Sequence, residues 1–83
     1  MDTHEIIRAL REDLDLSQSE VGAQINISQR KLSCIELGRT EPNLDDIRRI
    51  CRFYNVSADF LLGLPENLPY PRREDLFQTK KQP

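Results

Sequence analysis

Residues 16–38, LSQSEVGAQINISQRKLSCIELG, predict two short helices joined by a tight turn. Ser17 opens the S-x-x-E spacing of a capping box, so the first helix should begin at Gln18. This helix should end at residues 24–25, because Asn26 follows and asparagine tolerates the left-handed backbone of a sharp turn. The first half of the stretch therefore predicts a short capped helix followed by an abrupt change of direction.

The second helix of the pair should span residues 29–37, with Ser28 as its N-cap. Gly38 falls just beyond its end, where a left-handed backbone is favoured. Leu32 and Ile35 recur at helical spacing and should share a buried face. The outer face begins with polar and basic residues, which are Gln29, Arg30 and Lys31.

Three further helices are predicted from apolar stripes and cap residues, at residues 3–14, 44–54 and 58–62. We expect Thr3 to cap the first of these helices, and we expect Leu14 and Leu44 to lie on apolar stripes. Five short helices with brief connections predict a compact all-α bundle.

Length and composition limit the kind of protein this can be. A chain of 83 residues allows one domain. The two cysteines, Cys34 and Cys51, lie far from a Cys-x-x-Cys spacing, which favours a reduced, cytoplasmic protein over a disulfide scaffold. No apolar run approaches the length of a membrane span, so we expect no membrane partner.

The composition changes at Pro65, because residues 65–83 hold four of the five prolines. Residues 1–64 are therefore predicted to form the helical domain. Residues 65–83 are predicted to be an extended or disordered tail that could dock a protein partner. Within the tail, residues 73–78 could form one helical turn.

Motifs at fixed spacing extend from Ile6 to Leu64 without a gap. They are LSQxEV at 16–21, ISQ at 27–29, IExGR at 35–39, EP at 41–42, the apolar positions Leu44, Ile47 and Ile50, and FYxVSxDxLxG at 53–63. This series resembles the Cro/cI-type helix-turn-helix family, also called the xenobiotic-response-element (XRE) family of bacterial and phage regulators. The resemblance implies a lambda-repressor-like DNA-binding domain whose partner is double-stranded DNA.

In such a domain, the second helix of the pair lies in the major groove and presents its N-terminal residues to base edges. The candidates for base contacts are Gln29, Arg30, Ser33 and Cys34, and all four are expected to be exposed. Gln can pair bidentately with adenine and Arg with guanine. The alternative is that Gln29 and Arg30 form only a solvated polar face.

The candidates for phosphate contacts are Gln18, Lys31, Arg39, Thr40 and Asn43. Gln18 and Asn43 are predicted at helix N-termini, where backbone N–H groups and the helix dipole favour an anion. The resemblance implies the Gln18 contact, and the alternative is a surface glutamine without a task. The resemblance also implies a buried ion pair between Arg11 and Glu36 that supports the fold.

The charge of the chain argues against strong DNA binding. The net charge is −2, and residues 1–64 hold eight Lys/Arg against eleven Asp/Glu. A strongly basic patch is the usual sign of nucleic-acid binding. Between Gln18 and Arg39, however, three basic residues face two acidic ones, and burial of Glu36 would leave this surface positive. We therefore expect weak non-specific binding that salt readily abolishes.

These patterns favour a sequence-specific transcriptional regulator, a repressor that binds a two-fold symmetric operator as a homodimer through residues 29–37. The expected dimer patch is Phe60, Leu61 and Leu64. The alternative is an antitoxin-like or protein-interaction regulator that binds a protein partner through the helical domain and tail. The acidic balance, Leu37 and the proline-rich tail favour that alternative.

Signals of catalysis or metal binding are missing from the sequence. His4 is the only histidine, and no phosphate-binding glycine loop or metal-ligand spacing occurs. We therefore expect no enzymatic activity, metal or cofactor, and a surface position for His4.

Overall fold

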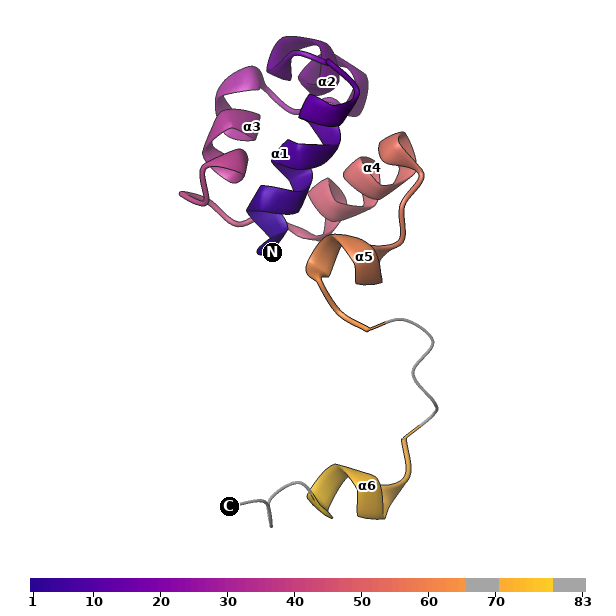
Figure 1. Ribbon diagram of the computed structural model, residues 1–83. Coiled ribbons are helices and arrows are strands. Elements are labelled where there is room, and N and C mark those ends of the chain that lie inside the picture. The colour runs from indigo at the N-terminus through magenta and orange to yellow at the C-terminus, as the bar shows by residue number, and fades with distance from the viewer. Residues whose placement is uncertain (66–70, 79–83) are drawn as a thin grey trace.

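The computed structural model describes residues 1–65 and 71–78, and these residues contain helices but no strands (Figure 1). The helices are α1 (Thr3–Asp13), α2 (Gln18–Ile25), α3 (Gln29–Glu36), α4 (Leu44–Tyr54), α5 (Ala58–Leu62) and α6 (Arg73–Gln78). The predicted all-α fold and the order of its first five helices are therefore confirmed.

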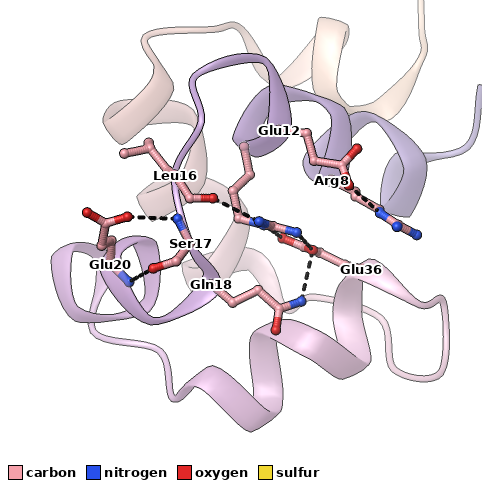
Figure 2. Close-up of polar contacts among 8 residues, drawn as sticks. Arg8, Glu12, Leu16, Ser17, Gln18, Glu20 and Glu36 are labelled. Carbon is pink, nitrogen blue, oxygen red and sulfur yellow. Dashed lines mark hydrogen bonds and ion pairs between the residues drawn. The ribbon is translucent and has the colours of Figure 1, made fainter.

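Local hydrogen bonds explain why α2 and α3 begin where they do. The Ser17 hydroxyl accepts from the Glu20 N–H at 3.0 Å, and the Glu20 carboxylate accepts from the Ser17 N–H at 2.8 Å (Figure 2). Asn26 ends α2 in the left-handed conformation, with φ of 58°. The Ser28 hydroxyl then accepts from the Lys31 N–H at 3.1 Å and caps α3. These local hydrogen bonds fix where α2 begins and where α3 begins after the turn.

The core is aliphatic and draws side chains from each of α1 to α5. The apolar residues exposed by 3% or less are Ile7, Val21, Ile25, Leu32, Ile35, Ile50 and Leu61. α3 packs on α1 and α2, while α5 packs on α1 and α4. The inner face of α3 is thus held by two helices, and its outer face is left to the solvent.

Three local predictions were wrong. The N-cap of α1 is Asp2 instead of Thr3, because Asp2 forms the capping box with the glutamate three residues further on. Leu14 is 59% exposed, since α1 ends one residue earlier and Asp15, with φ of 56°, turns the chain away. Leu44 is 72% exposed because it is the first residue of α4 and precedes the buried part of the stripe.

The tail includes α6, at the residues where the sequence allowed one helical turn. Residues 66–70 and 79–83 lie outside the described residues, so the expectation of an extended or disordered tail remains a prediction there. Among the helices that are described, none has the length and apolar character needed to cross a membrane.

Gly22 is buried where α2 meets the turn that follows it. A Cβ at this position would lie 2.5 Å from the carbonyl oxygen of Ile27, an atom of the turn backbone. The Ile27 N–H also donates to the Gly22 carbonyl at 2.9 Å, which holds the turn against the helix. The absence of a side chain at Gly22 therefore allows this close approach.

We expect Gly22→Ala to destabilise the fold even though alanine favours helices by about 1 kcal/mol over glycine. Displacing a packed backbone costs about 1–3 kcal/mol, so the net loss should be up to about 2 kcal/mol in urea denaturation. Ser19→Ala, at an exposed position of α2, is the matched control and should be neutral or slightly stabilising. A Gly22→Ala variant more stable than the unaltered chain would contradict this, because it would show that the Ile27 carbonyl can move away from a Cβ at little cost.

Candidate nucleic-acid interface

The exposed N-terminal turn of α3 carries the first two candidates for base contacts. Gln29 and Arg30 directly follow the cap and are both exposed. Ser33 and Cys34, one turn further on, are half-buried, so the prediction that they are exposed was wrong. The chain turns back onto this end of α3, where the Arg39 N–H donates to the Cys34 carbonyl at 2.9 Å. The accessible polar surface of α3 is therefore concentrated at its start.

A buried ion pair fixes the far end of α3 to α1. Nε of Arg11 lies 2.8 Å from Oε2 of Glu36, and its Nη2 lies 2.9 Å from Oε1 (Figure 2). The side chains are 14% and 2% exposed, and Nη1 of Arg11 also donates to the Leu16 carbonyl at 2.8 Å. The hydrogen bonds that Arg11 donates to Glu36 raise the pKa of Arg11. One guanidinium thus joins α1, the loop before α2, and α3.

Gln18 belongs to the same cluster. Its Nε2 donates to Oε1 of Glu36 at 3.1 Å, and the side chain is half-buried (Figure 2). The amide is therefore turned towards the ion pair and has a structural task. A phosphate contact from this side chain would use the second N–H of the same amide.

Lys31 also has a partner within the protein. Its Nζ lies 3.1 Å from Oδ2 of Asp46 and 3.3 Å from Oδ1. The sequence suggested a phosphate contact for this lysine, but the structure directs its ammonium group to a carboxylate on α4. Nothing local to α3 signals that contact, because the two residues lie on different helices.

The remaining phosphate candidates lie after α3 and are exposed. Arg39 and Thr40 occupy the loop between α3 and α4, and Asn43 is the N-cap of α4. The side-chain oxygen of Asn43 accepts from the Asp46 N–H at 2.8 Å, which leaves its NH₂ group free of the cap. Within residues 1–65 and 71–78, Arg30 and Arg39 make no ion pair.

Tyr54 is a member of the Arg11–Glu36 neighbourhood that the sequence did not indicate. Its hydroxyl is buried and has no hydrogen-bond partner among the described residues. Burial raises the pKa of Tyr54 to about 12, and the negative charge of Glu36 adds to the rise. The phenol therefore stays neutral in the folded protein well above the pH at which a free tyrosine ionises.

We expect Tyr54→Phe to leave stability at neutral pH within about 1 kcal/mol, because the hydroxyl has no partner to lose. The pKa of an unfolded tyrosine is about 10, below that of Tyr54 in the folded protein. Below pH 10, Tyr54 is neutral in both states and stability does not depend on its titration. Between about pH 10 and 12, only the unfolded state loses the proton, so the folded state loses stability as the pH rises. The unaltered chain should lose roughly 1–2 kcal/mol in that window, and Tyr54→Phe should not. Urea denaturation at rising pH measures this, in a Tyr70→Phe background that leaves Tyr54 the only tyrosine. Equal alkaline losses in both proteins would contradict the assignment.

Comparison with known families gives a direct match. The helix-turn-helix family model matches residues 7–61, which run from α1 into α5. The chain belongs to this family. The resemblance to Cro/cI-type (XRE) regulators is thereby confirmed, and helix-turn-helix proteins of this fold are DNA-binding regulators, not enzymes. The one histidine, His4, is half-buried, with its ring against Gly38.

Curated helix-turn-helix relatives include both a transcriptional activator and a transcriptional repressor. The chain is 28% identical to the HTH-type transcriptional activator BcrR of Enterococcus faecalis over 98% of its own length and 40% of BcrR. It is 32% identical to the HTH-type transcriptional regulator ImmR of Bacillus subtilis over 72% of its own length and 47% of ImmR. It is 28% identical to the cryptic phage CTXphi transcriptional repressor RstR of Vibrio cholerae, over 86% of this chain and 78% of RstR. The chain thus spans less than half of the first two relatives.

Solved helix-turn-helix structures agree with the fold. The P22 c2 repressor in complex with a synthetic operator superimposes with a TM-score of 0.71 and 31% identity, over 75% of this chain and 94% of that one. The solution structure of the P22 c2 DNA-binding domain gives a TM-score of 0.70 at the same identity, over 75% and 82%. The lambda-repressor-like fold predicted for the chain is confirmed.

Proposed function

We propose that this helix-turn-helix chain represses transcription by binding a two-fold symmetric operator as a homodimer, with α3 in the major groove. The observation that carries the proposal is that α3 has an exposed polar start, while its inner face is buried and its other end is fixed to α1. Gln29 and Arg30 are exposed at its start, while its inner face is buried and its end is fixed by the Arg11–Glu36 pair. A helix held in this way can present the same side chains to base edges in every encounter.

The division of contacts follows from exposure and partners. Gln29 and Arg30 would contact bases, with half-buried Ser33 and Cys34 at the edge of the groove. Phosphate contacts are assigned to Gln18, Arg39, Thr40 and Asn43, which would set register and affinity. Residues 1–64 are proposed as the DNA-binding domain, and residues 65–83 as a tail with a separate task.

A dimer is proposed because one recognition helix buries too little surface for useful specificity, while two spaced by about 34 Å meet successive major grooves. The dimer patch expected from the sequence needs one correction, since Leu61 is fully buried and belongs to the core. Phe60 and Leu64 are 46% and 54% exposed beside a hollow of about 540 Å³ between α1 and α5. Repression is favoured because RstR is matched over most of its length and BcrR is not.

The test starts from DNA that the protein itself selects. The unaltered chain is used to enrich a randomised pool of duplexes, and the enriched sequence is examined by gel shift between about 50 and about 200 mM salt. We expect a two-fold symmetric sequence and a discrete complex that holds two chains by native mass spectrometry. Failure to enrich any sequence would overturn the proposal.

A second candidate function is a regulator that binds a protein partner. It is favoured by Leu37, which is 50% exposed at the C-cap of α3, where a DNA-facing surface would gain from a polar side chain. Under this alternative, the randomised pool yields nothing and a stable complex requires another protein. Deleting residues 65–83 should then abolish that complex while leaving the helical domain folded.

A further inference from the structure

A buried carboxylate joins the N-termini of α3 and α4. Asp46 is 1% exposed, and its Oδ2 accepts both the Asn43 N–H at 3.1 Å and Nζ of Lys31 at 3.1 Å. The Asp46 N–H in turn donates to the side chain of Asn43 at 2.8 Å, which completes the capping box of α4. The capping box of α4 therefore holds the Asp46 carboxylate in place independently of Lys31.

Lys31 takes part in both helix starts. Its backbone N–H is the donor that satisfies the Ser28 cap of α3, while its ammonium group binds the capping box of α4. A buried carboxylate that loses its cation keeps an uncompensated charge, so the contact is not interchangeable with a surface pair. One lysine thereby couples the turn that carries Gln29 and Arg30 to the start of α4.

The charge balance of the contact matters for DNA. An ammonium group already neutralised by a carboxylate displaces few counterions from the DNA, because the pair as a whole carries no net charge. Arg39 lies beyond the end of the same helix, is exposed, and makes no ion pair within residues 1–65 and 71–78. The two cations should thus behave differently when salt is varied.

We propose that Lys31 is a positioning residue that sets the orientation of α3 against α4 and thereby the specificity of DNA binding, instead of contacting phosphate. The proposal rests on the proposed function and replaces the role that the sequence suggested for this residue. Its consequence is that sequence preference depends on a side chain that touches no base and no phosphate.

The experiment compares Lys31→Gln with Arg39→Gln on the duplex selected by the unaltered chain and on a scrambled duplex of the same composition. For Arg39→Gln, the slope of log K against log salt should become shallower by about 0.9 per protomer, with little change in discrimination. For Lys31→Gln, the slope should stay unchanged while discrimination between the two duplexes falls at least about fivefold. Lys31→Arg keeps a cation for Asp46 and should restore discrimination.

Two outcomes of this comparison would overturn the proposal. One is a Lys31→Gln slope as shallow as that of Arg39→Gln with discrimination preserved, which would make Lys31 a phosphate contact. The other is a Lys31→Gln variant unchanged in both respects, which would leave the contact without a role in binding. Enrichment of no sequence by the unaltered chain is a different result, since it refutes the proposed function before the variants are compared.

Asp46→Asn provides a second variant and a test of the contact without DNA. Releasing the ammonium group should steepen the salt slope and weaken discrimination, and adding Lys31→Gln should return the slope to that of the unaltered chain. In thermal unfolding without DNA, the two substitutions should be clearly non-additive, because they remove the same contact. Additive shifts in the unfolding midpoint would show that the pair does not couple the helices and would overturn the proposal.

Discussion

Replacing Arg11 by methionine should lower the free energy of unfolding by about 3–5 kcal/mol. Methionine retains much of the aliphatic volume of arginine. It leaves the Glu36 carboxylate charged and 2% exposed, and among the described residues only the Gln18 amide remains as a side-chain partner. It also removes the hydrogen bond to the Leu16 carbonyl. Urea denaturation at neutral pH measures the loss, and circular dichroism establishes whether the variant folds without denaturant.

The matched control is Arg8→Met, on the same helix. Arg8 pairs with Glu12 at 2.9 Å, but the two side chains are 54% and 52% exposed, so water replaces the lost partner. This variant should lose no more than about 0.5 kcal/mol. Adding Glu36→Leu to Arg11→Met should recover much of the loss, since it removes the uncompensated charge. Equal losses for Arg8→Met and Arg11→Met would show that burial of the Arg11 pair contributes nothing.

Most predictions that rest on a few neighbouring residues were confirmed, although the N-cap of α1 is Asp2 and not the predicted Thr3. Ser17 with Glu20, and Asn43 with Asp46, form capping boxes because each partner lies within one helical turn of the other. Asn26 adopts the left-handed conformation at the turn for a similarly local reason. Such features depend on short-range geometry, which is why the helix order and the helix-turn-helix could be predicted from the sequence.

The destinations of long polar side chains could not be predicted in this way. Lys31 meets Asp46 across 15 positions of the sequence, and Gln18 meets Glu36 across 18. Each contact depends on how two helices pack, and a helical pattern indicates only which face points outwards. The buried Tyr54 hydroxyl, which has no hydrogen-bond partner among the described residues, could not be predicted for the same reason. Its surroundings include Arg11 and Glu36, which lie on other helices.

Periodicity also cannot show where a stripe stops being buried or how closely two backbones approach. Leu14 and Leu44 continue apolar patterns but lie at helix ends, where the chain leaves the core. Gly22 lies within α2, where glycine is less favourable than alanine by about 1 kcal/mol. The structure shows why a glycine lies here: a Cβ at this position would lie 2.5 Å from the carbonyl oxygen of Ile27.

Gln29→Ala and Arg30→Ala should each weaken binding to the selected duplex far more than binding to scrambled DNA. A bidentate side-chain contact to a base discriminates by about 1–3 kcal/mol, and a homodimer loses it at both half-sites, so each variant should lose roughly 2–6 kcal/mol of specificity. Both side chains are exposed and lie outside the core, so unfolding should be nearly unaffected.

The two variants should also differ from one another. Arg30→Ala removes a cation that makes no ion pair among the described residues, so weaker binding to scrambled DNA should accompany its loss of specificity. Gln29→Ala removes no charge and should leave scrambled binding unchanged. Gln24→Ala, an exposed glutamine near the end of α2, is the control and should bind both duplexes normally. If Gln29→Ala and Arg30→Ala also bind the selected duplex with unchanged affinity and specificity, the N-terminal turn of α3 is not the base-contacting surface.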